Sequence, residues 1–81
     1  MKVFIDAGHG GNDPGAIGCN LYEKDITLTI SKRVQHHLQR HGVTVIMSRT
    51  GDTIVSLSQR SSLANSNNVD ASISIHCNAF N

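Results

Sequence analysis

The chain has 81 residues, with seven Lys and Arg against six Asp and Glu, and a formal net charge of +1 at pH 7. This length fits one small domain and excludes a two-domain enzyme. A near-neutral charge with scattered basic residues gives no electrostatic footprint for nucleic acid or an anionic membrane, so we expect neither as a partner. No stretch predicts a membrane span, and Asp6 comes too early for a secretory signal peptide.

The two cysteines, Cys19 and Cys77, are too few for a disulfide framework and too far apart for a C-x-x-C motif. The sequence does not decide whether the two form a single disulfide, and it does not indicate an oxidising or a reducing compartment. As separate free thiols they are typical of small buried packing residues, and neither is assigned to a metal site.

The first half of the chain predicts a strand, a long loop and a helix. A short apolar run at 3–5 is typical of a buried strand, and the glycine-rich segment 7–21 predicts a loop of the length that is often functional in small domains. Apolar residues recur every four positions in the segment 22–41, which predicts a helix that ends before Gly42. These apolar residues are Ile26, Ile30, Val34 and Leu38.

The second half predicts two more strands with a helix between them. The β-branched run at 43–47 and the alternating residues of 70–75 are typical of strands. Ser56 followed by Gln59 has the spacing of a capping box, which predicts a second helix from there to about Asn65.

This order predicts an α/β fold with a mostly parallel sheet, βαβαβ connectivity, right-handed crossovers and flanking helices. A parallel sheet is normally covered on both faces, and two helices can scarcely cover three strands. We therefore expect the chain to be an incomplete part of a larger α/β domain.

Three residues that could hold a metal ion fall at one edge of this sheet. In parallel α/β sheets, ligands bind beyond the carboxyl ends of the strands. His9 follows the first strand, His76 follows the third, and Glu23 lies in the first turn of the first helix, which starts from the same edge. Two imidazoles and one carboxylate form a three-ligand set for Zn²⁺ that leaves a position open, as in catalytic zinc sites suited to amide hydrolysis.

Each of these residues also has a purely structural interpretation. Glu23 lies three residues after Asn20 and could be the reciprocal partner of an asparagine N-cap. His9 could be a loop histidine bonded to backbone, and His76 a satisfied histidine at a strand end. A different histidine group, His36, His37 and His41, lies toward the other end of the predicted helix and is expected to be solvated.

The glycine-rich loop does not predict nucleotide binding. The segment 8–13 lacks the last glycine of G-x-G-x-x-G, and Gly15 is followed by Ala16-Ile17 where a P-loop requires Lys and Ser or Thr.

Several motifs along the chain belong together. They are the segments 3–11 and 13–16, Glu23-Lys24, Arg49-Thr50 with Asp52, Leu57, Arg60, Ala64-Asn65, and the segment 74–79. This set resembles the start of the zinc-dependent N-acetylmuramoyl-L-alanine amidase catalytic domain and covers the whole chain. The resemblance implies that His9, Glu23 and His76 are zinc ligands. Cys77 stands where the family usually has Ala.

The resemblance also implies a function at the bacterial cell wall. Family members cleave the amide between N-acetylmuramic acid and the L-alanine of the peptidoglycan stem peptide. Autolysins, sporulation and division enzymes and phage lysins all fit, and the lack of a signal peptide in this chain favours phage-lysin-type release slightly.

The family's general base is a glutamate late in the domain, whereas Glu23 is the only glutamate of this chain. Asp52 lies at the correct edge of the sheet, but its spacing does not support that role. We therefore expect residues 1–81 to be the N-terminal part of a single amidase domain, weakly active or inactive alone and completed by a missing C-terminal part. The alternative is a non-catalytic zinc- or glycan-binding module complete at 81 residues.

Overall fold

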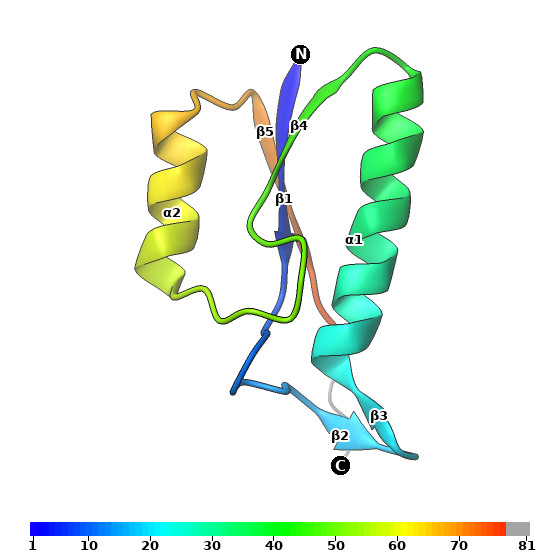
Figure 1. Cartoon of the computed structure of the whole chain (residues 1–81). Coiled ribbons are helices and arrows are strands. Elements are labelled where there is room, and N and C mark those ends of the chain that lie inside the picture. Colours follow the sequence, from blue (N-terminus) through cyan, green and yellow to red (C-terminus); the bar gives the residue numbers. More distant parts are fainter. Residues whose placement is uncertain (78–81) are drawn as a thin grey trace.

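The computed structural model describes residues 1–77, which form an α/β unit (Figure 1). Its elements are β1 (Lys2–Ala7), β2 (Ile17–Gly18), β3 (Leu21–Tyr22), α1 (Glu23–Arg40), β4 (Thr44–Met47), α2 (Leu57–Ser66) and β5 (Ala71–Ile75). The predicted alternation of three strands with two helices is confirmed. The prediction of one continuous loop over 7–21 is wrong, because β2 and β3 pair as a small antiparallel hairpin just before α1.

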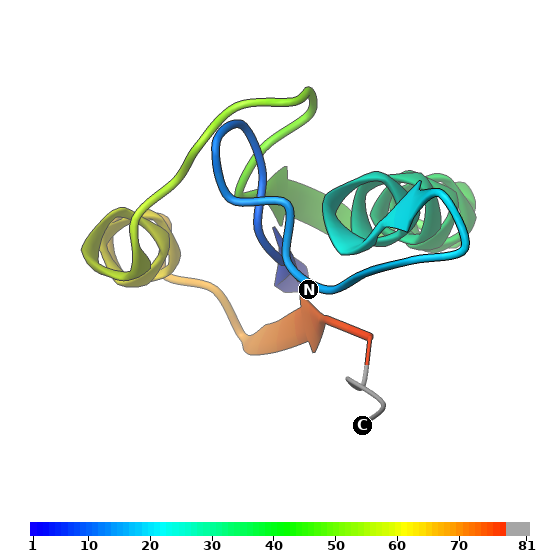
Figure 2. The same cartoon turned by 90° about the horizontal axis from the view of Figure 1, so that it is seen from below.

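The three long strands form a parallel sheet in the order β4-β1-β5. Phe4 in the central strand lies opposite Ile46 of β4 and Ser72 of β5. The two helices lie on opposite faces of the sheet, as Figure 2 shows. This is the arrangement that two crossovers of the same hand produce when the strand order reverses at β1.

Helix α1 packs on the sheet through small polar side chains. Thr27 and Ser31 have no exposed surface, whereas Ile30 of the predicted apolar stripe is 42% exposed. The Thr27 hydroxyl donates a 2.6 Å hydrogen bond to the carbonyl of Gly8, which brings the helix close to the end of β1. The helix itself is confirmed, but its apolar stripe does not mark its most buried face.

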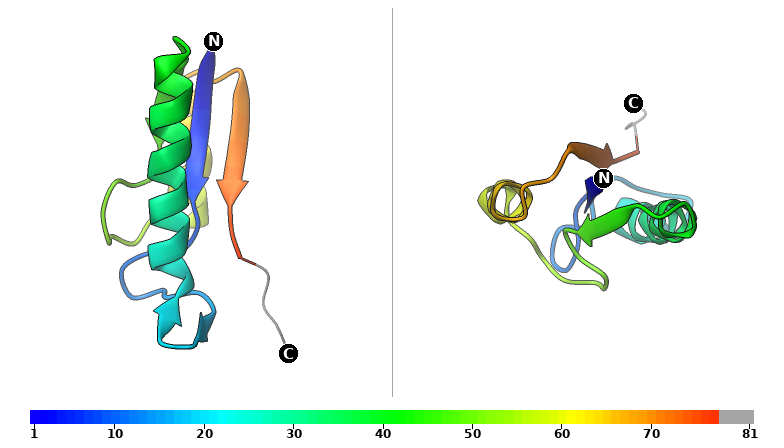
Figure 3. Two further views of the ribbon diagram at one scale, coloured as in Figure 1. Left: turned by 90° about the vertical axis from the view of Figure 1, so that its right-hand side faces the viewer. Right: turned by 90° about the horizontal axis from the view of Figure 1, so that it is seen from above.

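The apolar core is thin, as expected for a sheet that two helices cannot cover. Within residues 1–77, the buried apolar side chains all belong to β1: they are Val3, Phe4, Ile5 and Ala7. Figure 3 shows β5 at one edge of the sheet, where Ile73 is 39% exposed. In the described part of the chain, neither helix has the length and apolar character needed to cross a membrane.

The N-terminus of α2 is a capping box, as the sequence predicts. The Ser56 hydroxyl accepts from the backbone N–H of Gln59 at 3.1 Å, and the Gln59 side chain accepts from the backbone N–H of Ser56 at 2.8 Å.

We expect Ser56→Ala to lower the free energy of unfolding by about 1 kcal/mol, because the N–H of Gln59 loses its acceptor. Urea denaturation followed by circular dichroism measures this change. Ser61→Ala is the matched control: Ser61 is exposed inside the same helix, where alanine has the higher helix propensity and should leave stability unchanged or slightly raised. Equal effects of the two substitutions would contradict the capping role.

Candidate metal centre

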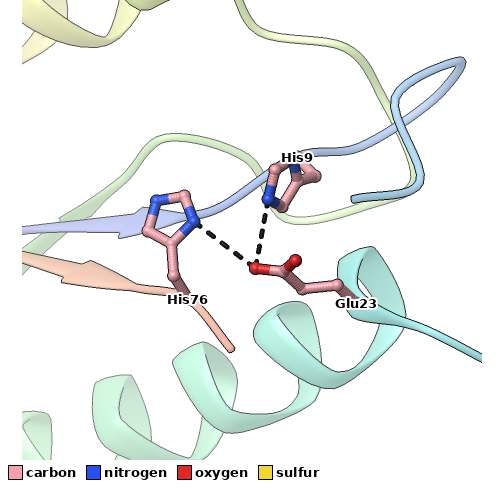
Figure 4. A group of neighbouring side chains, drawn as sticks. All are labelled: His9, Glu23 and His76. Atoms are coloured by element: carbon pink, nitrogen blue, oxygen red, sulfur yellow. Dashed lines mark ion pairs between the residues drawn. The ribbon is translucent and has the colours of Figure 1, made fainter. Parts of the chain in front are cut away.

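The strand order places the ends of β1 and β5 side by side. These are the carboxyl ends of the strands, beyond which ligands bind in open α/β sheets. His9 follows β1, His76 directly follows β5, and Glu23 is the first residue of α1. Figure 4 shows the three side chains converging from these three elements.

One carboxylate oxygen lies between the two imidazoles. Glu23 Oε2 is 3.1 Å from His9 Nε2 and 3.5 Å from His76 Nδ1. One ligand atom from each residue lies within 4.8 Å of the others, the only such group of three that residues 1–77 contain. The two rings stand nearly perpendicular, with centroids 5.2 Å apart. The structure therefore brings together all three residues that the sequence predicts as ligands.

Glu23 is held by backbone donors from two distant segments. Its Oε1 accepts from the N–H of Ala16 and its Oε2 from the N–H of Cys77, both at 2.9 Å. Burial of this carboxylate, which is 5% exposed, raises its pKa, but the two N–H donors and the neighbouring histidines outweigh burial and hold the pKa of Glu23 below its ordinary value. The side chain is thus an anion aimed at the two imidazoles.

The capping interpretation of Glu23 is wrong. Tyr22, not Asn20, is the N-cap of α1, and no side chain caps this end of the helix. Glu23 therefore reaches back to Ala16 and across to Cys77 rather than to an asparagine N-cap.

Two glycines beside the cluster leave no room for a side chain. His9 has a left-handed backbone, with φ at 65°. A Cβ added at Gly8 would lie 2.5 Å from His76 Cε1, and one added at Gly15 would lie 2.6 Å from His9 Cδ2 and 2.8 Å from Glu23 Oε1. Gly15 also has a positive φ of 69°, which disfavours any side chain. The small residues of this loop therefore allow His9, Glu23 and His76 to come together.

Two buried arginines hold the backbone where the chain leaves β1. Arg49 donates to the carbonyls of Ala7 at 3.1 Å and Gly8 at 2.9 Å. Arg60 donates to the carbonyls of Ala7 at 2.8 Å and His9 at 3.0 Å, and it pairs with Asp6. From the sequence, both arginines are recognised only as part of the family motifs, with no role assigned to them. No local sequence pattern indicates that an arginine will be buried.

Lys24 and Asp52 hold the glycine-rich loop at Gly11. Lys24 Nζ lies 3.0 Å from the carbonyl of Gly11 and 2.9 Å from Asp52 Oδ2, while Asp52 Oδ1 accepts from the N–H of Gly11 at 2.8 Å. The hydrogen bond from Lys24 holds the pKa of Asp52 below its ordinary value. Asp52 is therefore engaged in holding the glycine-rich loop.

Other histidines and cysteines of the chain do not belong to the cluster of His9, Glu23 and His76. His37 and His41 pack together with ring centroids 4.9 Å apart at the far end of α1. The two cysteines are unpaired: Cys77 is half-buried, whereas Cys19 is exposed beside the hairpin strands, so the prediction that both are buried packing residues is wrong for Cys19. The residues Asn78 and Ala79 of the last motif lie outside the described residues.

The model of the N-acetylmuramoyl-L-alanine amidase family matches residues 3–81. The chain belongs to this family. The sporulation-specific N-acetylmuramoyl-L-alanine amidase of Bacillus subtilis (strain 168) is 46% identical over 81 residues, covering 98% of this chain and 32% of that protein. The amidase LytC of the same strain is 47% identical over 77 residues, covering 95% of this chain and 16% of LytC.

Solved amidase structures share the fold. AmiC2 of Nostoc punctiforme superposes with a TM-score of 0.96 and 44% identity, over 100% of this chain and 46% of that one. An amidase of Clostridium difficile 630 superposes with a TM-score of 0.95 and 46% identity, over 98% of this chain and 44% of that one. The chain thus spans less than half of these solved structures and about a third or less of the two Bacillus relatives.

We expect Gly15→Ala to weaken the affinity for Zn²⁺ by about 10- to 100-fold, as is usual when groups that orient the ligands are disturbed. The added methyl group must displace His9 and Glu23. Titration of zinc against a chromophoric chelator measures the change. Gly18→Ala is the matched control, because a Cβ at Gly18 meets nothing within 4 Å. If both variants bind zinc as the wild type does, the close packing of Gly15 on the ligands is irrelevant to the site.

Proposed function

We propose that residues 1–81 are the N-terminal, zinc-binding part of a single amidase catalytic domain. The substrate is peptidoglycan, and the bond hydrolysed is the amide between N-acetylmuramic acid and L-alanine of the stem peptide. The observation that carries this proposal is the convergence of His9 Nε2, Glu23 Oε2 and His76 Nδ1 in a chain of this family. The substrate places the protein at the bacterial cell wall.

The donor set fits zinc. Imidazole nitrogen and carboxylate oxygen are common zinc ligands, and three protein ligands leave one position open, as in catalytic sites. The lowered pKa of Glu23 keeps this ligand ionised without a metal, so the anion is ready for a cation. A zinc ion held by these residues supplies Lewis acidity toward an amide carbonyl and toward water.

The surrounding residues orient the ligands and leave them accessible. The N–H groups of Ala16 and Cys77 hold the Glu23 carboxylate in place from two sides. The side chains of His9 and His76 are 24% and 49% exposed, whereas that of Glu23 is 5% exposed. The imidazole side of the cluster therefore faces solvent, where a polymeric glycan with its peptide can approach.

We place the general base of the reaction outside these 81 residues. Glu23, the only glutamate, is committed as a ligand, and Asp52 is held by Lys24 and Gly11. A positioned general acid or base contributes about 10²- to 10⁴-fold in rate, so this part of the domain should hydrolyse slowly by itself. The length of the relatives beyond the matched region leaves room for that group.

We expect the purified protein to bind close to one zinc ion per chain, and His9→Ala or His76→Ala to abolish this binding. Each substitution removes one of three ligands. Atomic emission measurement after dialysis gives the stoichiometry. His36→Ala, which removes an exposed histidine of α1, should bind zinc as the wild type does. A wild-type protein that binds no zinc would overturn the proposed site.

The reaction is tested on purified peptidoglycan. We expect slow formation of new L-alanine amino termini, with no new reducing sugar ends, and loss of this activity in Glu23→Gln, which removes the anionic ligand. Dinitrophenylation followed by hydrolysis and chromatography identifies the new amino terminus. New reducing ends would contradict amide cleavage. Zinc binding without any cleavage, by a protein that also carries the rest of the amidase domain, would favour the non-catalytic zinc- or glycan-binding module.

A further inference from the structure

The imidazole of His9 faces a carboxylate on each side, and its hydrogen bond is to Asp13. Its Nε2 faces Glu23 Oε2 at 3.1 Å, and its Nδ1 lies 2.9 Å from Asp13 Oδ2. Both carboxylates can only accept, so a neutral His9 can donate to one of them at a time. The contact of Nδ1 with Asp13 has hydrogen-bond geometry, whereas the contact of Nε2 with Glu23 is an ion-pair contact only, and this places the proton on Nδ1. The lone pair of His9 then lies on Nε2, the nitrogen that faces the metal centre.

Asp13 is itself fixed by the loop. Its backbone N–H and carbonyl exchange hydrogen bonds with Gly10 at 2.9 and 2.8 Å, and its Oδ1 accepts from the N–H of Gly15 at 3.2 Å. Oδ1 is thereby engaged with the backbone, and Oδ2 is aimed at His9. The carboxylate is therefore held in one orientation relative to the ring.

We propose that Asp13 is a positioning residue that holds His9 as its Nδ1–H tautomer and so presents the Nε2 lone pair to the metal ion. Carboxylates that accept from the distal N–H of a histidine ligand orient the ring and increase its basicity. This inference rests on the proposed function, because it takes His9 as a zinc ligand. Within residues 1–77, the ring of His76 has no carboxylate partner other than Glu23, so this device belongs to His9 alone.

Asp13→Asn separates this role from the role of Asp13 in the turn. The amide keeps a carbonyl oxygen for the N–H of Gly15, but it places an NH₂ donor against His9 Nδ1. The ring must then accept at Nδ1 and carry its proton on Nε2, the tautomer that cannot bind a metal through that atom. The substitution thus reverses the polarity of one hydrogen bond and leaves the turn intact.

We expect Asp13→Asn to weaken zinc affinity by about 10- to 100-fold. Competition with a chromophoric chelator measures it. The control is Asp25→Asn, which makes the same change of charge at an exposed position of α1 and should bind zinc as the wild type does. If Asp13→Asn binds zinc as tightly as Asp25→Asn does, the inference is overturned.

A second measurement needs neither metal nor activity. Long-range ¹H–¹⁵N spectra of the metal-free protein, recorded at a pH where His9 is neutral, should show the proton on Nδ1 in the wild type and on Nε2 in Asp13→Asn. A wild-type His9 with its proton on Nε2 would overturn the inference even if the variant failed to fold. Absence of zinc binding in both the wild type and Asp25→Asn would instead overturn the proposed function, and the spectra would still decide the role of Asp13.

Discussion

Arg49 and Arg60 converge on the backbone carbonyls where the chain leaves β1. Their donors reach the carbonyls of Ala7, the last residue of β1, and of Gly8 and His9, which follow it. A buried carbonyl without a partner costs about 1–3 kcal/mol, so these contacts determine whether the glycine loop can adopt its observed path. Arg60 also ties α2 to the sheet through its ion pair with Asp6.

Polar packing of this kind links the stability of the fold to the geometry of the site. The Thr27 hydroxyl donates to the carbonyl of Gly8. Arg49 donates both to this carbonyl and to the carbonyl of Lys24 at the start of α1. The first turn of α1, which carries Glu23, is therefore fastened to the segment that carries His9. His9 and Glu23 are both held by hydrogen bonds from other segments, because Arg60 donates to the carbonyl of His9 and the N–H of Cys77 donates to Glu23.

The sequence predicts the alternation of elements and the convergence of His9, Glu23 and His76, because strand runs and helix periodicity are local signals and the carboxyl ends of parallel strands share one edge. It does not predict the packing of α1, because Thr27 and Ser31 are buried by a close helix–sheet approach that periodicity cannot detect. The sequence does not predict the β2–β3 hairpin either, because its strands have only two residues each and lie in a glycine-rich segment. The carboxylate of Asp13 and the two arginines act through long-range or loop contacts that leave no periodic pattern.

His9 and His76 lie near opposite ends of the chain and meet only because β5 pairs with β1. An ion bound between them would act as a reversible cross-link that closes almost the whole polypeptide into one loop. The unfolded chain has no such site, so binding would favour the folded state by mass action, by about 2.7 kcal/mol when free zinc is 100 times its dissociation constant. For a chain with so thin an apolar core, the availability of zinc in its surroundings would then set how much of the protein is folded.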